Sequence, residues 1–94
     1  MDDKRLNDLA ALFKIFSNST RIKILACLID GQKAVNEIAS QSHMSISAVS
    51  HQLKILQEND LVKSQRYGKN IYYSLSDNHV QTILEMGSKH IEEQ

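Results

Sequence analysis

The chain has a single cysteine, no proline and no long apolar run. One thiol, Cys27, can neither form an intrachain disulfide nor supply a metal site of several thiolates, and its apolar surroundings at 24–29 suggest a small buried residue. No stretch approaches the roughly 18–20 apolar residues of a membrane span, so we expect a cytoplasmic protein without a membrane partner. Without proline, repeats or a long linker, residues 1–94 are predicted to form one domain.

The chain also lacks the common enzyme motifs and a net charge. It contains no Gly-rich phosphate loop, no nucleophile elbow and no His-Glu-x-x-His motif, so we expect no enzyme. Its 11 basic and 11 acidic side chains cancel, but residues 43–76 hold four Lys/Arg against two Asp/Glu, whereas residues 77–94 hold one against four. The middle of the chain therefore suits a phosphate backbone and the tail suits a cation, although neither asymmetry is specific by itself.

Apolar residues at helical spacing predict four helices in the first part of the chain. A tight connection at His43 and Met44 separates the third from the fourth, and Ser19 and Ser45 are the expected N-caps of the second and fourth. Asp30 and Gly31 are the expected stop of the second helix. The predicted ranges are about 4–16, 19–29, 35–39 and 45–58.

The later part of the chain predicts a hairpin and one more helix. Strands are expected at 61–67 and 70–75, with Gly68 and Lys69 permitting the reversal, and a last helix at about 77–93. The fold class is therefore mainly α with a small β-hairpin, in the order of four helices, two strands and one helix. This is the winged form of the helix-turn-helix, with 45–58 as the recognition helix that enters a major groove and 61–75 as the wing.

The outward face of the predicted recognition helix is rich in small and hydrogen-bonding side chains. Such groups suit DNA, since Gln pairs with adenine, Ser donates or accepts, and Lys meets guanine or phosphate. A solvated helix face is the alternative, but such a face more often carries several Glu and Lys. The candidate DNA-binding residues are Ser45, Ser47, Ser50, His51, Gln52 and Lys54 on the helix, and Arg66, Lys69 and Asn70 on the wing.

Two carboxylates and two imidazoles on the last helix have spacings that suit a shared metal ion: Asp77, His79, His90 and Glu93. The two histidines lie within roughly 20° of one face, but eleven residues rise about 16 Å, which is too far for one ion. Two antiparallel copies of the helix would close two equivalent sites, each with two nitrogens and two oxygens. Asp77 is expected to cap the helix in either case; in the alternative interpretation this is its only role, and the other three are ordinary polar residues.

The chain resembles the ArsR/SmtB family of bacterial metal-responsive winged-helix repressors. The resemblance lies in residues 13–25, in the Ser-x-x-Ser-His-Gln-Leu-x-x-Leu pattern of 47–56, and in the Gly-containing wing at 61–75. It implies a metal site on the last helix at the four residues named above, antiparallel pairing of these helices, and a metal-bound His whose other ring nitrogen points to the backbone near Asp60 or Leu61. The region of the third helix, residues 33–38, lacks the Cys-x-Cys pair that is typical of arsenic, cadmium or lead sensors.

These features together predict a metal-sensing repressor that acts as a homodimer. The first and last helices carry more apolar residues than one small core needs, which favours a dimer interface. The apo dimer would bind two-fold symmetric operator DNA, and Zn(II), with Co(II) as a possible surrogate, would release it and derepress genes of metal efflux or sequestration. Two alternatives remain: a winged-helix regulator with a non-metal inducer or none, and an interaction module without DNA.

Overall fold

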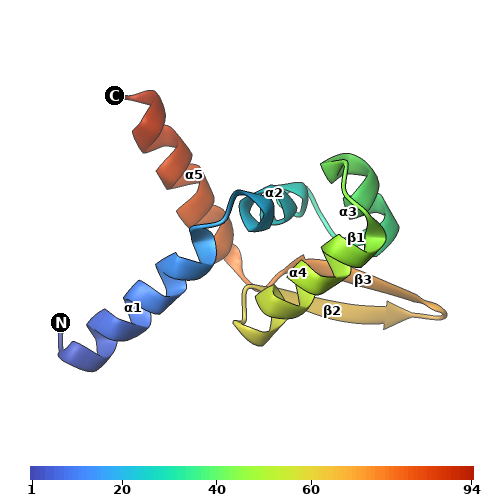
Figure 1. The fold of residues 1–94 in the computed structure, drawn as a ribbon, viewed down its shortest axis with the longest axis horizontal. Coiled ribbons are helices and arrows are strands. Elements are labelled where there is room, and N and C mark those ends of the chain that lie inside the picture. Colours follow the sequence, from blue (N-terminus) through green and yellow to red (C-terminus); the bar gives the residue numbers. More distant parts are fainter.

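The computed structural model describes all 94 residues as five helices and one small sheet. In Figure 1, α1 and α5 diverge from the body on one side, and the β2–β3 hairpin projects on the other, beside α3 and α4. No helix is long and apolar enough to cross a membrane. The elements are α1 (Asp3–Phe16), α2 (Ser19–Cys27), β1 (Lys33–Ala34), α3 (Val35–Ser42), α4 (Ile46–Glu58), β2 (Val62–Tyr67), β3 (Asn70–Leu75) and α5 (Asn78–Glu92).

The sheet has three antiparallel strands in the order β1-β3-β2, where the sequence predicted only a hairpin. The hairpin itself is confirmed, with Val62 opposite Leu75 and Tyr67 opposite Asn70. Its two-residue turn contains Gly68 at φ 63°, a conformation that glycine adopts without a steric penalty. Strand β1 adds two residues to the other edge of β3. A strand of two residues is too short for any alternation to be recognised in the sequence.

Helix α2 differs at both ends from its prediction. Its N-cap is Asn18 rather than Ser19, and the Asn18 side-chain oxygen accepts a hydrogen bond from the backbone N–H of Arg21 at 3.1 Å. The helix ends at Cys27, where Lys33 donates from its Nζ to the Cys27 carbonyl at 2.7 Å. Lys33 is 8% exposed and pairs with Asp30, and this hydrogen bond lowers the pKa of the Asp30 carboxyl. The buried ammonium thus satisfies the helix end in place of a continued turn.

The core lies where α2, α3, α4 and the base of the wing meet. The predicted inward stripe of α4, Val49, Leu53 and Leu56, is buried as expected. Cys27 is only half-buried, with its Sγ 3.4 Å from the hydroxyl of Ser42, because it lies at the last residue of α2 rather than inside a longer helix. The buried hydrophobic residues are Phe16, Ile24, Leu25, Leu28, Ile38, Ala39, Val49, Leu53, Leu56, Leu61, Val62 and Val80.

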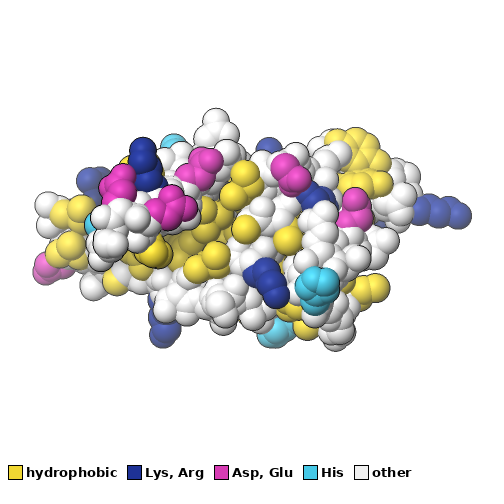
Figure 2. All heavy atoms as spheres, turned by 90° about the horizontal axis from the view of Figure 1, so that it is seen from above, with side chains coloured by type: hydrophobic (Ala, Val, Ile, Leu, Met, Phe, Trp, Pro, Cys, Tyr) yellow, Lys and Arg dark blue, Asp and Glu magenta, His cyan; other side chains and the backbone are white.

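Helices α1 and α5 contribute little to this core and leave large apolar side chains exposed. Phe13 is 52% and Ile91 73% exposed, although each belongs to an amphipathic helix. Figure 2 shows hydrophobic side chains gathered toward the side of the molecule where α5 lies, with carboxylates above them. A single chain therefore has an apolar surface that it does not itself bury, as expected of a protein that pairs with another copy.

Candidate nucleic-acid interface and metal-binding residues

Helix α4 begins at a side-chain cap and presents a polar face opposite its buried stripe. The Ser45 hydroxyl accepts a hydrogen bond from the backbone N–H of Ala48 at 3.0 Å, so the expected cap is confirmed. The O–H of Ser45 is still available as a donor. Four of the predicted DNA-binding residues are exposed on the outward face of this helix: Ser47, Ser50, His51 and Lys54.

The turn before α4 and the turn after it both contain a residue in the left-handed region. His43, at the end of α3, has φ 56°, and Asp60, after α4, has φ 60°. The backbone N–H of Met44 donates to the Ala39 carbonyl at 3.0 Å, which closes the turn between α3 and α4. Both left-handed residues carry a Cβ, so the direction of α4 is fixed at some cost in backbone energy.

Gln52 lies apart from the other predicted DNA-binding residues of α4. It is half-buried at the edge of the helix that faces α2, and its Oε1 accepts a hydrogen bond from Nε of Arg21 at 3.0 Å. Sequence reasoning did not identify Arg21, which is 31 positions away. No sequence periodicity relates two residues of different helices, so this contact could be found only in the fold.

The wing places its three predicted residues near the tip of the hairpin, where Arg66, Lys69 and Asn70 are all exposed. Tyr67 and Tyr72 pack edge to face with ring centroids 5.6 Å apart, so these two rings serve wing packing. The carboxamide of Gln57 donates to the hydroxyl of Ser64 at 3.0 Å and thereby ties the wing to the last turn of α4. The far end of the hairpin remains free of the helices, as Figure 1 shows.

Asp77 is both the cap of α5 and a neighbour of His79. Its Oδ1 accepts hydrogen bonds from the backbone N–H groups of His79 at 2.9 Å and Val80 at 3.3 Å, which confirms the expected cap. Its second oxygen, Oδ2, lies 3.5 Å from Nδ1 of His79, and the His79 side chain is 90% exposed. One carboxylate oxygen and one imidazole are thus brought together and open to solvent.

The other two predicted ligands lie at the opposite end of α5. Glu93 is the C-cap residue, and Nε2 of His90 is 2.9 Å from the side-chain nitrogen of Gln94. Within one chain no three His, Cys, Asp or Glu side chains gather around a point that could hold a metal ion. The structure therefore brings Asp77 to His79, but it does not bring this pair to His90 and Glu93.

The start of α5 is attached to the end of α4 through the backbone. The N–H of Ser76, directly before the cap Asp77, donates to the carbonyl of Leu61 at 3.1 Å. Leu61 in turn donates its N–H to the Leu56 carbonyl of α4 at 2.9 Å. The resemblance implied that a metal-bound His would reach this region, and its Leu61 carbonyl already accepts one hydrogen bond here.

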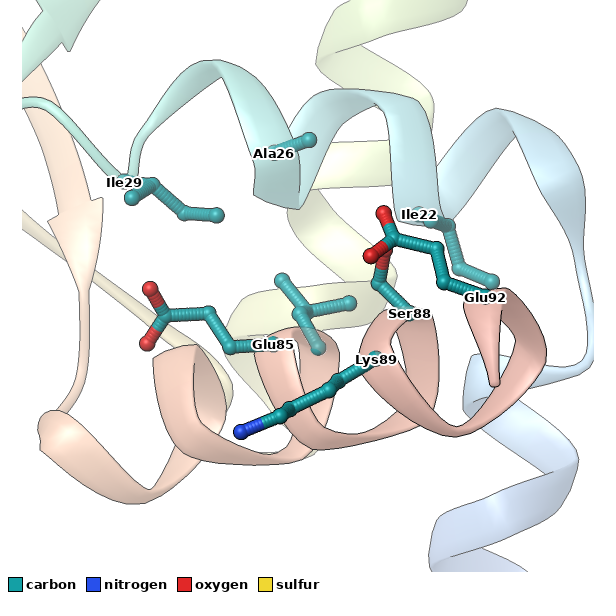
Figure 3. Close-up of a pocket in the computed structure, with 8 residues that line it drawn as sticks. Ile22, Ala26, Ile29, Glu85, Ser88, Lys89 and Glu92 are labelled. Carbon is teal, nitrogen blue, oxygen red and sulfur yellow. The ribbon is translucent and has the colours of Figure 1, made fainter.

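A groove of about 560 Å³ separates α2 from α5, with apolar residues on its α2 side. Figure 3 shows Ile22, Ala26 and Ile29 facing the side chains of α5 across this groove. A second groove of about 360 Å³ runs beside it between α1, α2 and α5, lined by Phe13 and Ile91 among others. None of the predicted DNA-binding or metal-binding residues lines either groove, so both belong to the uncovered apolar surface.

Comparison with known proteins places these features in a family. Residues 18–64, from the cap of α2 into β2, match the model of bacterial regulatory proteins of the arsR family. The chain is 38% identical to the transcriptional repressor SmtB homolog of Synechocystis over 90% of its own length and 64% of that protein's length. It is 36% identical to the cadmium resistance transcriptional regulatory protein CadC homolog of Staphylococcus aureus, over 88% of this chain and 69% of that protein.

A solved structure agrees with the fold over the whole chain. It is the homodimeric winged helix-turn-helix DNA-binding domain of Mb0332 from Mycobacterium bovis, a possible ArsR-family regulator, with a TM-score of 0.88 and 27% identity. The likeness covers 100% of this chain and 90% of that one. The predicted winged helix-turn-helix is thereby confirmed, and that neighbour is a homodimer.

Proposed function

Because the chain belongs to the arsR family of bacterial regulatory proteins, we propose that it is a repressor whose dimer binds operator DNA and is released by Zn(II). The family consists of DNA-binding transcription regulators, so the prediction that the chain is no enzyme is confirmed. The single observation that carries the DNA proposal is the exposed polar face of α4, set in a helix-turn-helix with a projecting wing.

DNA binding would use the face of α4 for bases and the wing for the backbone. Short hydroxyl side chains, such as those of Ser47 and Ser50, let a helix approach the groove floor closely, while Lys54 reaches phosphate or guanine. Arg66 and Lys69, near the tip of the hairpin, are positioned to meet a neighbouring stretch of backbone or minor groove. Two copies related by a two-fold axis would read a symmetric operator in successive major grooves.

The metal proposal is supported by the donor set on α5. Asp77 keeps one oxygen on the helix cap and has the other free, beside the exposed imidazole of His79. The cap therefore holds this carboxylate in place before any metal binds. His90 and Glu93 of a second copy, running antiparallel, would complete a set of two nitrogens and two oxygens, which suits tetrahedral Zn(II) and offers no thiolate for softer ions. Co(II) would bind as a surrogate.

His90 needs one local change to serve as a ligand through Nε2. The amide nitrogen of Gln94 only donates, so at 2.9 Å the ring nitrogen accepts this hydrogen bond and holds its lone pair toward Gln94. Metal binding at that nitrogen would displace the exposed Gln94 side chain, which costs little at a solvated position. The CadC homolog, a relative whose name refers to cadmium resistance, supports a metal as the class of effector.

Release of DNA requires that metal bind the DNA-free arrangement more tightly than the DNA-bound one. When bound to two α5 helices, Zn(II) would fix their separation and tilt. The backbone contact from Ser76 to Leu61 places the start of α5 against the turn that ends α4. We infer that the fixed α5 pair holds the two α4 helices at a spacing that does not match the operator.

A fluorescence-anisotropy titration of operator DNA with and without Zn(II) tests the proposal. The parent should bind without metal and be released by Zn(II), whereas a His79→Ala dimer should bind DNA equally well and remain bound in Zn(II). Arg5→Ala, which changes an exposed charge on α1, serves as the matched control and should respond like the parent. Metal-independent binding by the parent would refute the metal-sensing part and leave DNA binding intact.

A winged-helix regulator with a non-metal inducer or none is the second candidate. The groove between α2 and α5 favours it, because it is large enough for a small apolar molecule and lies beside the helix that would pair with the other copy. The two candidates differ in one measurement: this one predicts that a zinc titration of the dimer detects no tight binding.

A further inference from the structure

Arg21 on α2 and Gln52 on α4 form a side-chain hydrogen bond between the two helices. Nε of Arg21 donates to Oε1 of Gln52 at 3.0 Å, and both residues are half-buried. The backbone N–H of Arg21 is itself bound by the side chain of Asn18, the cap of α2. Arg21 therefore starts from a fixed position in the first turn of its helix.

The chemistry of the guanidinium fixes which end of the Gln52 amide faces α2. Arginine has five N–H donors and no acceptor, so the atom next to Nε must be the carbonyl oxygen. The amide nitrogen of Gln52 has no partner within the chain, yet the structure leaves no buried side-chain nitrogen or oxygen without one. That nitrogen is consequently not fully buried, and the N–H donors of Gln52 lie on the side of its amide group that is not bound to α2.

Resting on the proposed DNA-binding role of α4, we propose that Arg21 is a positioning residue that orients Gln52 as a hydrogen-bond donor and so makes it select guanine over adenine. Guanine presents two acceptors in the major groove, N7 and O6, and both can meet outward N–H groups. A bidentate pair with adenine needs the glutamine oxygen to accept from N6 while the nitrogen donates to N7. Here a charge-assisted hydrogen bond holds that oxygen toward α2.

This assignment differs from what the residue type alone suggests, since glutamine by itself pairs most readily with adenine. It also differs from a simple phosphate contact by Arg21. An arginine bound to phosphate would contribute affinity on every sequence and would raise the salt dependence of binding by about one unit. A positioning residue changes the base preference at one position and leaves the salt slope unchanged.

The test begins with selection of duplexes from a randomised DNA pool by the full chain, followed by binding of all single-base variants of the selected duplex. The position at which Gln52→Ala loses discrimination identifies the base pair that Gln52 contacts. At this position the parent should prefer guanine to adenine by about tenfold, the value of a good base contact. Arg21→Ala should reduce the preference to within about twofold there and nowhere else, with an unchanged salt slope.

Two further variants separate the explanations. Lys23→Ala removes an exposed cation from the same helix without touching Gln52, and its base profile should equal that of the parent. Gln52→Glu keeps an acceptor for Arg21 but presents only acceptors outward, so its preference should change from guanine to cytosine, whose N4 donates. If Arg21→Ala fails to fold, the orientation of Gln52 is still tested by the parent, because a parent that prefers adenine to guanine at this position would contradict the proposal.

Each remaining outcome counts against the proposal in a recognisable way. If Arg21→Ala lowers affinity on all duplexes and reduces the salt slope while its base profile stays that of the parent, Arg21 is a phosphate contact and the inference is wrong. If Gln52→Glu keeps the parental preference, Gln52 does not read the base. If the parent enriches no sequence at all, the proposed DNA-binding function fails together with this inference.

Discussion

Asp77 has two tasks in the structure, and two substitutions separate them. Its Oδ1 caps α5 by accepting from two backbone N–H groups, and its Oδ2 is free beside His79. Asn caps a helix as well as Asp does but lacks the negative charge that a metal site gains from a carboxylate. Asp77→Asn should therefore retain stability and lose zinc affinity, whereas Asp77→Ala should lose both.

The expected magnitudes follow from the contacts. Loss of an N-cap costs about 1 kcal/mol, which for a domain of this size lowers the midpoint of thermal unfolding by about 4–8 °C. Asp77→Ala should show this shift in circular-dichroism melts in the presence of a chelator, at one fixed protein concentration because the protein is proposed to be a dimer. Asp77→Asn should unfold at the same midpoint temperature as the parent. Its zinc affinity, measured by competition with a chromophoric chelator, should fall by more than about tenfold. A loss of at least this size is expected even when the changed residue only hydrogen-bonds to a metal ligand and does not bind the metal itself.

Each role of Asp77 can be contradicted separately. If Asp77→Asn binds zinc as tightly as the parent, Asp77 is only a cap and the proposed donor set is wrong. If Asp77→Ala unfolds at the same temperature as the parent in chelator, the two hydrogen bonds at the start of α5 contribute nothing measurable to stability. The proposal that the cap holds the Asp77 carboxylate in place before metal binds would then be wrong.

Four further predictions concern the metal, the DNA, the turns and the dimer. His79→Ala or His90→Ala should lower zinc affinity by orders of magnitude and leave apo operator binding nearly intact; release of His90→Ala from operator by zinc at the parental concentration would refute the site. Lys54→Ala and Arg66→Ala should each reduce the salt slope of operator binding by about one unit, and unchanged slopes would contradict the phosphate contacts. His43→Gly should raise the free energy of unfolding by about 1 kcal/mol in urea titrations, since glycine tolerates φ 56°; a loss of stability would show that the imidazole makes a larger contribution. Sedimentation should show a dimer at micromolar concentration, and a monomer with and without metal would rule out the α1–α5 interface.

What the sequence could predict is limited to relations between neighbours in the chain. The caps at Ser45 and Asp77 depend on residues two or three positions ahead, and the sequence located both. Asn18 and Ser19 are equally good caps by type, so only the extended backbone at Asn18 decides between them. The contact between Arg21 and Gln52 depends on how two helices cross, and no local pattern records it.

In the candidate metal site, too, the sequence predicts contacts between neighbours in the chain but not contacts between distant residues. Asp77 and His79 lie side by side because both stand at the start of one helix, and the sequence alone is enough to predict that proximity. It also predicted that the remaining two ligands would lie too far away for a single chain, and the structure places them at the other end of α5. Whether the two halves meet depends on a second copy of the chain, and the distance between the halves follows from helix geometry alone.

The two residues of β1 restrict how α3 and the wing can move relative to one another. They pair Lys33 and Ala34 with Tyr73 and Tyr72 of β3, and α3 begins at the very next residue, Val35. The first helix of the helix-turn-helix, α3, thus follows directly on a strand that is hydrogen-bonded to β3 of the wing, with no linker residue between them. In the proposed complex with DNA, each protomer would therefore hold α4 and the wing at a fixed separation along the duplex. In that dimer, adjustment to operators of different half-site spacing would come from rotation of one protomer against the other.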